Sequence, residues 1–394
     1  MAHSILSPSA SHRWLNCPAA PRLEATVPDR STDYAKEGTL AHAICAIKLK
    51  QYLGLNTTEE QKEIWRLKGY RTKDGKSIYS GEMEEHTDDY VGYVLGKYEE
   101  ARQTCKDALL MVETTLDFGD YVPDSRGTAD ALIIADGTMH VIDFKYGQGV
   151  KVDAEDNSQM MIYALGAYLA ESYEYDIREV SATIFQPRKG NVSTYDISVT
   201  ELMEWAEREL KPKARLAYSG EGPQNAGPWC QFCRVAAQCR ALADHSLSVL
   251  EEFGNPEQLK LMEPDEIAKA LDKVPTVETW IKAVKEYSLN AALNGTAFPG
   301  YKIVEGRSVR KITDPQEAAA ILSREGYDSE AFLKPTELQP LTVLEKLVGK
   351  KKLAGLLEGC IIKPEGKPTL VPMSDKRAAF TPTSDSLDIL NDIE

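Results

Sequence analysis

The stretch GTADALIIADGTMHVIDFK, residues 127–145, decides the fold. Two apolar runs with alternating polar positions flank Asp136-Gly137, and Asp-Gly between such runs predicts a tight β-hairpin. In an antiparallel hairpin with this turn, facing residues have numbers that sum to about 273. The sequence therefore predicts that Asp130 and Asp143 face each other near the open end of the hairpin.

Two facing carboxylates suggest a site for a divalent cation. Like charges directly across a ladder repel each other unless a cation lies between them. Such an ion can polarise a phosphate and lower the pKa of a bound water. Lys145 follows Asp143 by two residues and so points to the same side of the strand, where it can orient the water or offset developing charge. Taken alone, the same residues are also typical of solvated strand ends.

Three further residues are candidates for this site. Gln159 and Tyr163 are four apart on an expected helix, so they share one face of it. His42, on an expected N-terminal helix, can supply an imidazole, which favours manganese beside magnesium. Glu113, on the strand before the hairpin, is an additional candidate. Each of these residues alone is weak evidence, because an isolated histidine is usually structural and Tyr163 fits a core position.

The order of apolar patterns predicts an α/β fold rather than a helical bundle. A short capped helix begins near Ser7 and ends at Cys17, before Pro18. Residues 57–80 are expected to be an irregular insertion. The other expected elements are helices 34–49 and 84–106, strands 109–118, 127–135 and 138–145, helix 155–170, strands 180–186 and 192–197, and helix 200–218.

Length and charge limit the function classes. A chain of 394 residues suits two domains. Its net charge of −15 argues against a protein that coats nucleic acid nonspecifically, but a DNA-cutting enzyme needs only a local basic path. The longest uncharged run is too short to cross a membrane, and we expect a cytoplasmic protein. Four basic runs could form a local path for nucleic acid, or merely a solvated face: Arg188-Lys189, Lys211–Arg215, Arg307–Lys311 and Lys350–Lys352.

Seven cysteines include a cluster that indicates metal binding. Cys230, Cys233 and Cys239 lie within ten residues, and Cys17 can complete a four-thiolate site. A link over more than two hundred residues would act as a staple of the core. Thiolates suit either zinc or an iron–sulfur cluster, and the Cys-x-x-Cys spacing alone favours Zn²⁺.

Taken in order, these motifs resemble those of RecB-like nucleases of the PD-(D/E)XK superfamily. The motifs are Gly38-x-x-x-His42, Gly127-x-x-Asp130, Asp143-Phe-Lys145 and Gln159-x-x-x-Tyr163. The flanking cysteines resemble the iron–sulfur-stapled branch, which includes AddB-type nuclease domains and CRISPR-associated RecB-like exonucleases. The resemblance covers about residues 1–245, and the chain carries Asp where Glu is commoner at position 143.

The resemblance implies a restriction-endonuclease-like core, with a mixed central sheet flanked by helices, N-terminal helices and a mainly helical C-terminal region. It implies that His42, Asp130, Asp143 and the backbone carbonyl of Phe144 bind Mg²⁺ or Mn²⁺. By the same resemblance, Lys145 is the catalytic lysine, Gln159 and Tyr163 assist it, and a [4Fe-4S] cluster occupies Cys17, Cys230, Cys233 and Cys239.

The implied activity is that of a metal-dependent deoxyribonuclease, an exonuclease acting on single-stranded DNA or duplex ends. The implied setting is recombination or repair of phage or mobile-element DNA in a bacterial host, with a single-strand annealing or single-strand binding protein as a possible partner. The alternative is a noncatalytic, nuclease-like scaffold that binds DNA or a recombination partner. The chain has no phosphate-binding loop of a motor ATPase, no Gly-x-Ser-x-Gly elbow and no His-Glu-x-x-His helix.

The rest of the chain predicts an accessory region of unassigned role. Residues 246–380 are expected to form a helical domain with a small β element, and residues 381–394 an acidic disordered tail. The expected elements are two antiparallel helices from 264 and over 276–293, a strand pair within 301–312, and helices 315–325 and 341–357.

Overall fold

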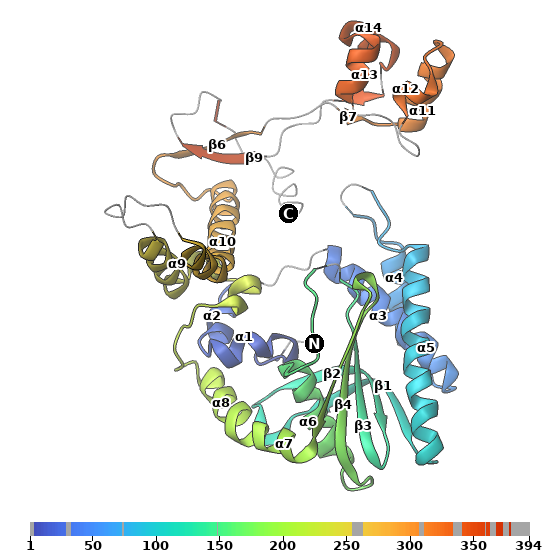
Figure 1. Cartoon of the computed structure of the whole chain (residues 1–394), viewed down its shortest axis with the longest axis vertical. Helices are drawn as coiled ribbons and strands as arrows, with labels where there is room; N and C mark the ends of the chain where they lie inside the picture. Colours follow the sequence, from blue (N-terminus) through green and yellow to red (C-terminus); the bar gives the residue numbers. More distant parts are fainter. Residues whose placement is uncertain are drawn as a thin grey trace. The chain divides into compact units, whose positions relative to one another are not determined.

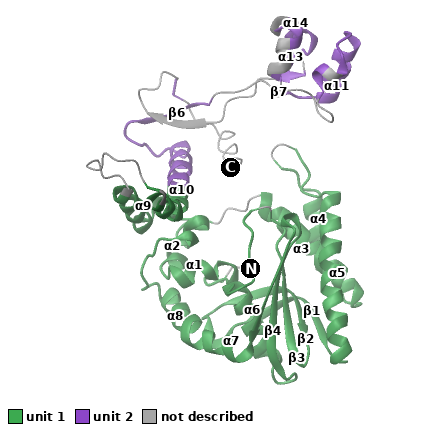
Figure 2. Ribbon diagram, viewed as in Figure 1, with its two compact units in different colours: residues 1–280 green, residues 281–394 purple. Residues whose placement is uncertain are grey.

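The structure is a computed structural model of the full chain. It describes residues 4–28, 33–72, 75–147, 149–253, 263–306, 311–333, 341–358, 360–362, 368–372 and 378–379. The chain divides into two compact units, residues 1–280 and 281–394 (Figure 2). This division falls inside helix α10, whereas the sequence interpretation placed a boundary after residue 245. The domain roles stay predictions, and the expected tail 381–394 lies outside the described residues.

Unit 1 is built on a five-stranded mixed sheet with the order β1-β2-β3-β4-β5 (Figure 1). All neighbouring strands are antiparallel except β3 and β4, which are parallel. A parallel pair needs a crossover connection, and α6 supplies it. The elements concerned are β1 (Leu109–Asp117), β2 (Arg126–Ile134), β3 (Gly137–Phe144), α6 (Ser158–Glu171), β4 (Ile177–Gln186) and β5 (Asn191–Ser198).

The register of the β2–β3 hairpin is the predicted one. Ala131 pairs with Ile142 and Ile133 with His140, so that the numbers of each pair sum to 273. Gly137 has φ +87°, a conformation that residues with a Cβ rarely adopt, which explains glycine at this turn. The pairing runs up to Ala131 and Ile142, and the next two residues toward the open end are Asp130 and Asp143.

Helices cover both faces of the sheet, which gives three layers (Figure 1). One apolar core joins α3 (Asp33–Tyr52) and α5 (Gly81–Thr104) to one face. A second core joins α6 and the helical segment from Val199 to Ser219 to the other face. That segment is α7 (Val199–Trp205), a π-helical turn η4 (Ala206–Leu210) and α8 (Lys211–Ser219). The α/β class with a helix-flanked mixed sheet is therefore confirmed.

Short helical elements from the two ends of the predicted nuclease region pack together. The N-terminal ones are η1 (Pro8–Ala10), α1 (Ser11–Asn16) and α2 (Ala20–Glu24), and the later ones are η5 (Pro228–Phe232), η6 (Ala236–Gln238) and α9 (Arg240–Phe253). A buried carboxylate joins the two groups. Glu24 accepts hydrogen bonds from Arg13 Nε at 2.9 Å and from the backbone NH of Arg234 at 2.8 Å.

The expected irregular insertion at residues 57–80 is wrong in its first half, which forms helix α4 (Thr58–Lys68). Ion pairs three residues apart, Glu59 with Lys62 and Glu63 with Arg66, support this helix on its exposed side. The polar composition of this segment suggests an irregular loop, but a helix that buries little apolar surface also carries few apolar residues.

Two further expectations need correction. The expected antiparallel helices after residue 263 are one helix, α10 (Pro264–Leu293), with Pro275 in its interior. The expected strand pair within 301–312 is not a pair: β6 (Tyr301–Glu305) pairs with β9 (Pro368–Pro372), and β7 (Lys311–Ile312) pairs with β8 (Ile361–Ile362).

Unit 2 also holds α11 (Pro315–Arg324), α12 (Ser329–Phe332), α13 (Leu341–Val348) and α14 (Lys350–Leu356), which share a small core. The helices at 315–325 and 341–357 were predicted, the second as one helix rather than two. Within the described residues, no helix combines the length and apolar character that a membrane span needs.

Candidate metal centre

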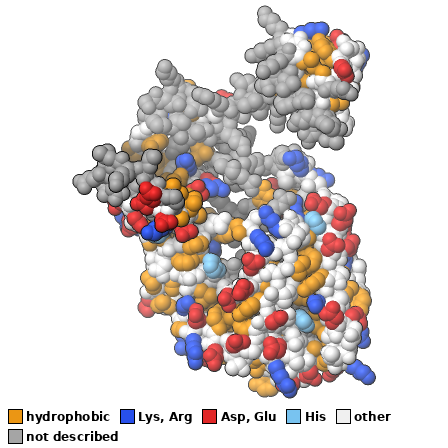
Figure 3. Space-filling model, viewed as in Figure 1, with side chains coloured by type: hydrophobic (Ala, Val, Ile, Leu, Met, Phe, Trp, Pro, Cys, Tyr) orange, Lys and Arg blue, Asp and Glu red, His pale blue; other side chains and the backbone are white. Residues whose placement is uncertain are grey.

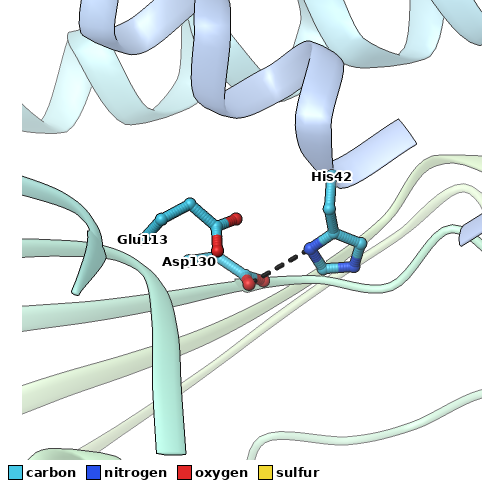
Figure 4. Close-up of side chains that lie close together, drawn as sticks. All are labelled: His42, Glu113 and Asp130. Carbon is cyan, nitrogen blue, oxygen red and sulfur yellow. Dashed lines mark hydrogen bonds and ion pairs between the residues drawn. The ribbon is translucent and has the colours of Figure 1, made fainter. Parts of the chain in front are cut away.

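Three side chains from three elements converge where the β2–β3 hairpin opens. His42 comes from α3, Glu113 from β1 and Asp130 from β2 (Figure 4). His42 Nδ1 lies 3.1 Å from Asp130 Oδ1. One ligand atom from each of the three residues lies within 4.8 Å of the others, the spacing at which one ion can be shared. No other set of three or more His, Cys, Asp or Glu among the described residues meets this condition.

The backbone changes direction at this point of the sheet. Glu113 has φ +51°, which is rare for a residue with a long side chain. On β2, Ala129 belongs to the core under α6 and Ala131 to the core under α3, although residues two apart normally share a face. The alternation therefore resets at Asp130, beside Glu113, and this reset accompanies the turn of both carboxylates toward His42.

The electrostatics of the three residues are strongly coupled. Burial would lower the pKa of His42, but the nearby carboxylates outweigh it and raise that pKa to about 9. Burial and the charge of Asp130 raise the pKa of Glu113 to about 7. The pKa of Asp130 stays below its usual range despite burial, because His42 and the NH of Phe144 stabilise its charge. The cluster thus gathers two carboxylates and an imidazole in a half-buried site.

Asp143, Lys145 and Gln159 form a closed ring of contacts on the α6 side of the sheet. Lys145 Nζ lies 3.2 Å and 3.0 Å from the two Asp143 oxygens and donates to Gln159 Oε1 at 3.0 Å. Gln159 Nε2 in turn donates to Asp143 Oδ1 at 3.1 Å. Each member therefore orients the other two. Burial raises the pKa of Asp143, although Lys145 opposes the effect.

Asp143 does not belong to the three-residue group itself. It is joined to that group through the backbone, since the NH of Phe144 donates to Asp130 Oδ2 at 2.7 Å. Asp143 is only 4% exposed, and its Oδ2 accepts no hydrogen bond of good geometry, even though Lys145 Nζ is close. The Lys145 ammonium compensates the buried charge, while this oxygen stays available to join the carboxylates of Glu113 and Asp130 around a divalent ion.

The remaining predicted site residues have different surroundings. Tyr163 is buried, and its ring lies beside Phe118, with 6.3 Å between the ring centroids. Burial, followed by the charge of Asp143, raises the pKa of the Tyr163 phenol. For Phe144 the structure shows the NH donating to Asp130, and the predicted role of its carbonyl stays a prediction. Glu113 was underrated from the sequence, because no local motif signals its positive φ.

The four predicted cluster cysteines line one small cavity between α2 and α9. Cys17 and Cys230 are buried, and Cys233 and Cys239 are half-buried. The backbone NH of Asn225 donates to Cys17 Sγ at 3.4 Å. All four cysteines therefore surround one space, as a shared thiolate site requires.

The predicted basic runs form no broad basic surface in the described part of the chain. Arg188 pairs with Glu37 at 3.1 Å, and Lys211 and Lys213 pair with glutamates on their own helical segment. Acidic and basic side chains are interspersed on the face shown in Figure 3. The runs Arg307–Lys311 and Lys350–Lys352 lie largely outside the described side chains.

Comparisons with known proteins give one family match. The model of DUF2800, "Protein of unknown function", matches residues 3–378. A solved structure described as a "Putative exonuclease" from Eubacterium rectale is 10% identical, with 67% of this chain and 91% of that chain covered and a TM-score of 0.30. The structure of SSO0001 is 15% identical, with 59% and 96% covered and a TM-score of 0.22. Likenesses at these TM-scores carry no argument about function.

Proposed function

We propose that this chain, which belongs to the DUF2800 family, is a divalent-metal-dependent nuclease that hydrolyses phosphodiester bonds in DNA. One observation carries the proposal: an imidazole and two carboxylates converge beside the ring of Asp143, Lys145 and Gln159 at the open end of a hairpin. Three carboxylates this close together repel one another, and a structural ion pair needs only one, so the grouping favours a site for a cation.

The proposed metal ligands are His42, Glu113, Asp130 and Asp143. Carboxylates suit Mg²⁺, and an imidazole among the ligands favours Mn²⁺ beside it. When bound, such an ion would polarise the phosphate and lower the pKa of a coordinated water. Glu113 was not among the ligands that the sequence resemblance implied, so its inclusion rests on the geometry alone.

The protein side chains supply orientation and charge. Lys145 Nζ, fixed by Asp143 and Gln159, carries a positive charge beside the position where a phosphate must lie. Gln159 holds the amine in place without adding a charge of its own. Tyr163 acts indirectly, by packing α6 against Gly127 and Phe118, and we propose no contact between it and the substrate.

For the cysteine cavity we propose a [4Fe-4S] cluster that joins the N-terminal helices to the segment 228–239. All four cysteines line one cavity, and their order along the chain resembles that of the iron–sulfur-stapled branch, which supports the cluster. Zinc is the alternative. Anaerobic purification separates the two, since a cluster gives a brown protein with broad visible absorbance and zinc gives a colourless one.

Exonuclease mode, a role in phage recombination or repair, and a single-strand annealing or binding partner stay predictions from the sequence resemblance. The activity itself is tested by incubating labelled single-stranded and duplex DNA with the full chain and Mg²⁺ or Mn²⁺. Wild type is expected to degrade DNA, and Asp143→Ala is expected to be inactive while remaining folded. Binding of DNA without any degradation by wild type would favour the noncatalytic scaffold.

A further inference from the structure

A cleft of about 510 Å³ opens beside Lys145 and Gln159, next to the candidate metal centre. Its other walls come from three stretches far apart in the sequence, residues 9–13, 150–158 and 228–232. Clefts of this size, within the common range of about 300–1,000 Å³, hold one or two nucleotide-sized groups rather than a duplex. The cleft therefore joins the proposed catalytic lysine to the cysteine-bearing segment.

Two aromatic residues form one wall of the cleft. Phe232 is 70% exposed, which is unusual for a phenyl ring. Trp229 is held in place, because its Nε1 donates to Asn225 O at 2.8 Å. A Cβ at Gly227 would lie 2.5 Å from the Trp229 ring, so glycine is needed for this placement. The aromatic wall is thus presented on a fixed backbone.

The opposite side of the cleft favours an anion. Lys145 and Lys151 both line it, and α6 begins there with Asn157 as its N-cap. The Asn157 side chain already accepts the NH groups of Gln159 and Met160, so the start of α6 contributes the positive end of its dipole rather than free donors. Lys151 is 3.7 Å from Asp153, and both side chains are more than 60% exposed, so this pair neutralises the lysine only weakly. In a chain with a net charge of −15, this is a local cationic path.

We propose that this cleft binds the terminal nucleotides of a single-stranded nucleic acid, with one base stacked on Phe232 and the adjoining phosphate near Lys145 and the start of α6. Every base offers a π face, so stacking with cations recognises single strands without reading sequence. A base inside a duplex already stacks on its neighbours and cannot give its face to Phe232. The proposal deepens the proposed nuclease function by naming its substrate class, and it rests on that function only for the hydrolysis step after binding.

Binding is measured separately from cutting. The full chain, in chelator to prevent hydrolysis, is titrated into three fluorescent ligands: an oligothymidylate, an abasic oligomer with the same backbone and a blunt duplex, each about 12 units long, within the usual single-strand site size. Phe232→Ala is expected to weaken oligothymidylate binding about tenfold, since stacking contributes about 1–3 kcal/mol per base. Wild type and Phe232→Ala should have equal affinity for the abasic oligomer, because it has no base to stack.

Two controls separate stacking from folding. Phe232→Tyr keeps the ring and should bind as wild type does. Trp65→Ala removes another exposed aromatic side chain, 83% exposed on α4 and outside the cleft, and should leave binding unchanged. If Phe232→Ala loses visible absorbance as well as affinity, the substitution has damaged the cysteine segment. The proposal then holds only if Phe232→Tyr keeps both the absorbance and the affinity of wild type.

The outcomes distinguish the two proposals. Equal oligothymidylate binding by wild type and Phe232→Ala overturns the stacking site, even if wild type degrades DNA. Phe232-dependent binding without degradation by wild type supports the site and contradicts the nuclease. Tighter binding of the duplex than of the single strand, unchanged by Phe232→Ala, also overturns the site.

Discussion

The ring of Tyr163 lies so close to Gly127 that a Cβ at residue 127 would stand 2.8 Å from Tyr163 Cε1. Pro8 Cγ and Phe118 Cζ would stand 2.9 Å and 3.2 Å from the same Cβ. The absence of a side chain at Gly127 therefore lets α6 settle on β2 just before Asp130. This contact gives a physical reason why the Gly-x-x-Asp and Gln-x-x-x-Tyr motifs occur together.

Gly127→Ala is expected to destabilise the protein by about 1–3 kcal/mol, the usual cost of overpacking a filled core. Urea unfolding followed by circular dichroism measures this change. The matched control is Gly96→Ala in α5, where a Cβ meets nothing within 4 Å. That substitution should be neutral or stabilise by up to about 1 kcal/mol, since alanine favours helices. Equal stabilities for the two variants would contradict the close packing.

Divalent metal is expected to raise the thermal stability of the native chain. An ion that binds only the folded state stabilises it by about 2.7 kcal/mol at a hundredfold excess over its dissociation constant. A Mn²⁺ titration followed by the unfolding temperature tests this, and Asp130→Asn should abolish most of the rise. Asp117→Asn, at an exposed strand-end carboxylate paired with Arg126, is the control and should respond as wild type does. If Mn²⁺ still raises the unfolding temperature of Asp130→Asn, the ion binds elsewhere.

Gln159→Leu is expected to lower kcat about 10- to 100-fold, as loss of a supporting hydrogen bond commonly does. The amide bonds both Lys145 and Asp143, and leucine keeps its approximate volume without either bond. KM should change little, because the residue positions Lys145 rather than the substrate. Gln103→Leu, at an exposed glutamine on α5 outside the cleft, is the control. A change confined to KM would assign Gln159 to substrate binding instead.

Glu24→Gln is expected to destabilise the protein by about 1–3 kcal/mol and to speed loss of the cysteine-bound centre. Glutamine keeps the shape of the side chain but removes the charge that pairs with Arg13, so that the link between α2 and the segment after Cys233 weakens. Unfolding and visible absorbance after anaerobic reconstitution report the two effects. The control, Glu209→Gln, breaks an exposed pair with Lys213 and should cost less than about 0.5 kcal/mol. If both variants lose the same stability and the same visible absorbance, Glu24 does not link the two segments.

The hairpin and its acidic ends could be predicted because their signals are local. Asp136-Gly137 fixes the turn, the turn fixes the register, and the register places Asp130 near Asp143. Gln159 also follows from local spacing, since helix α6 begins at Ser158 and directs it at Lys145. The sequence was therefore informative where one short segment determines the geometry.

The remaining features depend on distant contacts or on backbone strain. The partners of β6 and β7 lie about fifty or more residues further along the chain, and alternation along one strand cannot identify its partner. A positive φ can be anticipated from the sequence at glycine or asparagine, but nothing in the sequence signals it at Glu113. The expected break before residue 276 is absent, because α10 continues through Pro275 although proline normally ends or kinks a helix.

The central claim is that one divalent ion binds at the open end of the β2–β3 hairpin. Anomalous diffraction from crystals soaked in Mn²⁺ tests it most directly. We expect one strong peak within about 2.0–2.3 Å of carboxylate oxygens of Asp130 and Asp143, with His42 or Glu113 completing the site. If crystals at saturating Mn²⁺ show no peak at this position, although the wild-type protein cleaves DNA, the claim is contradicted.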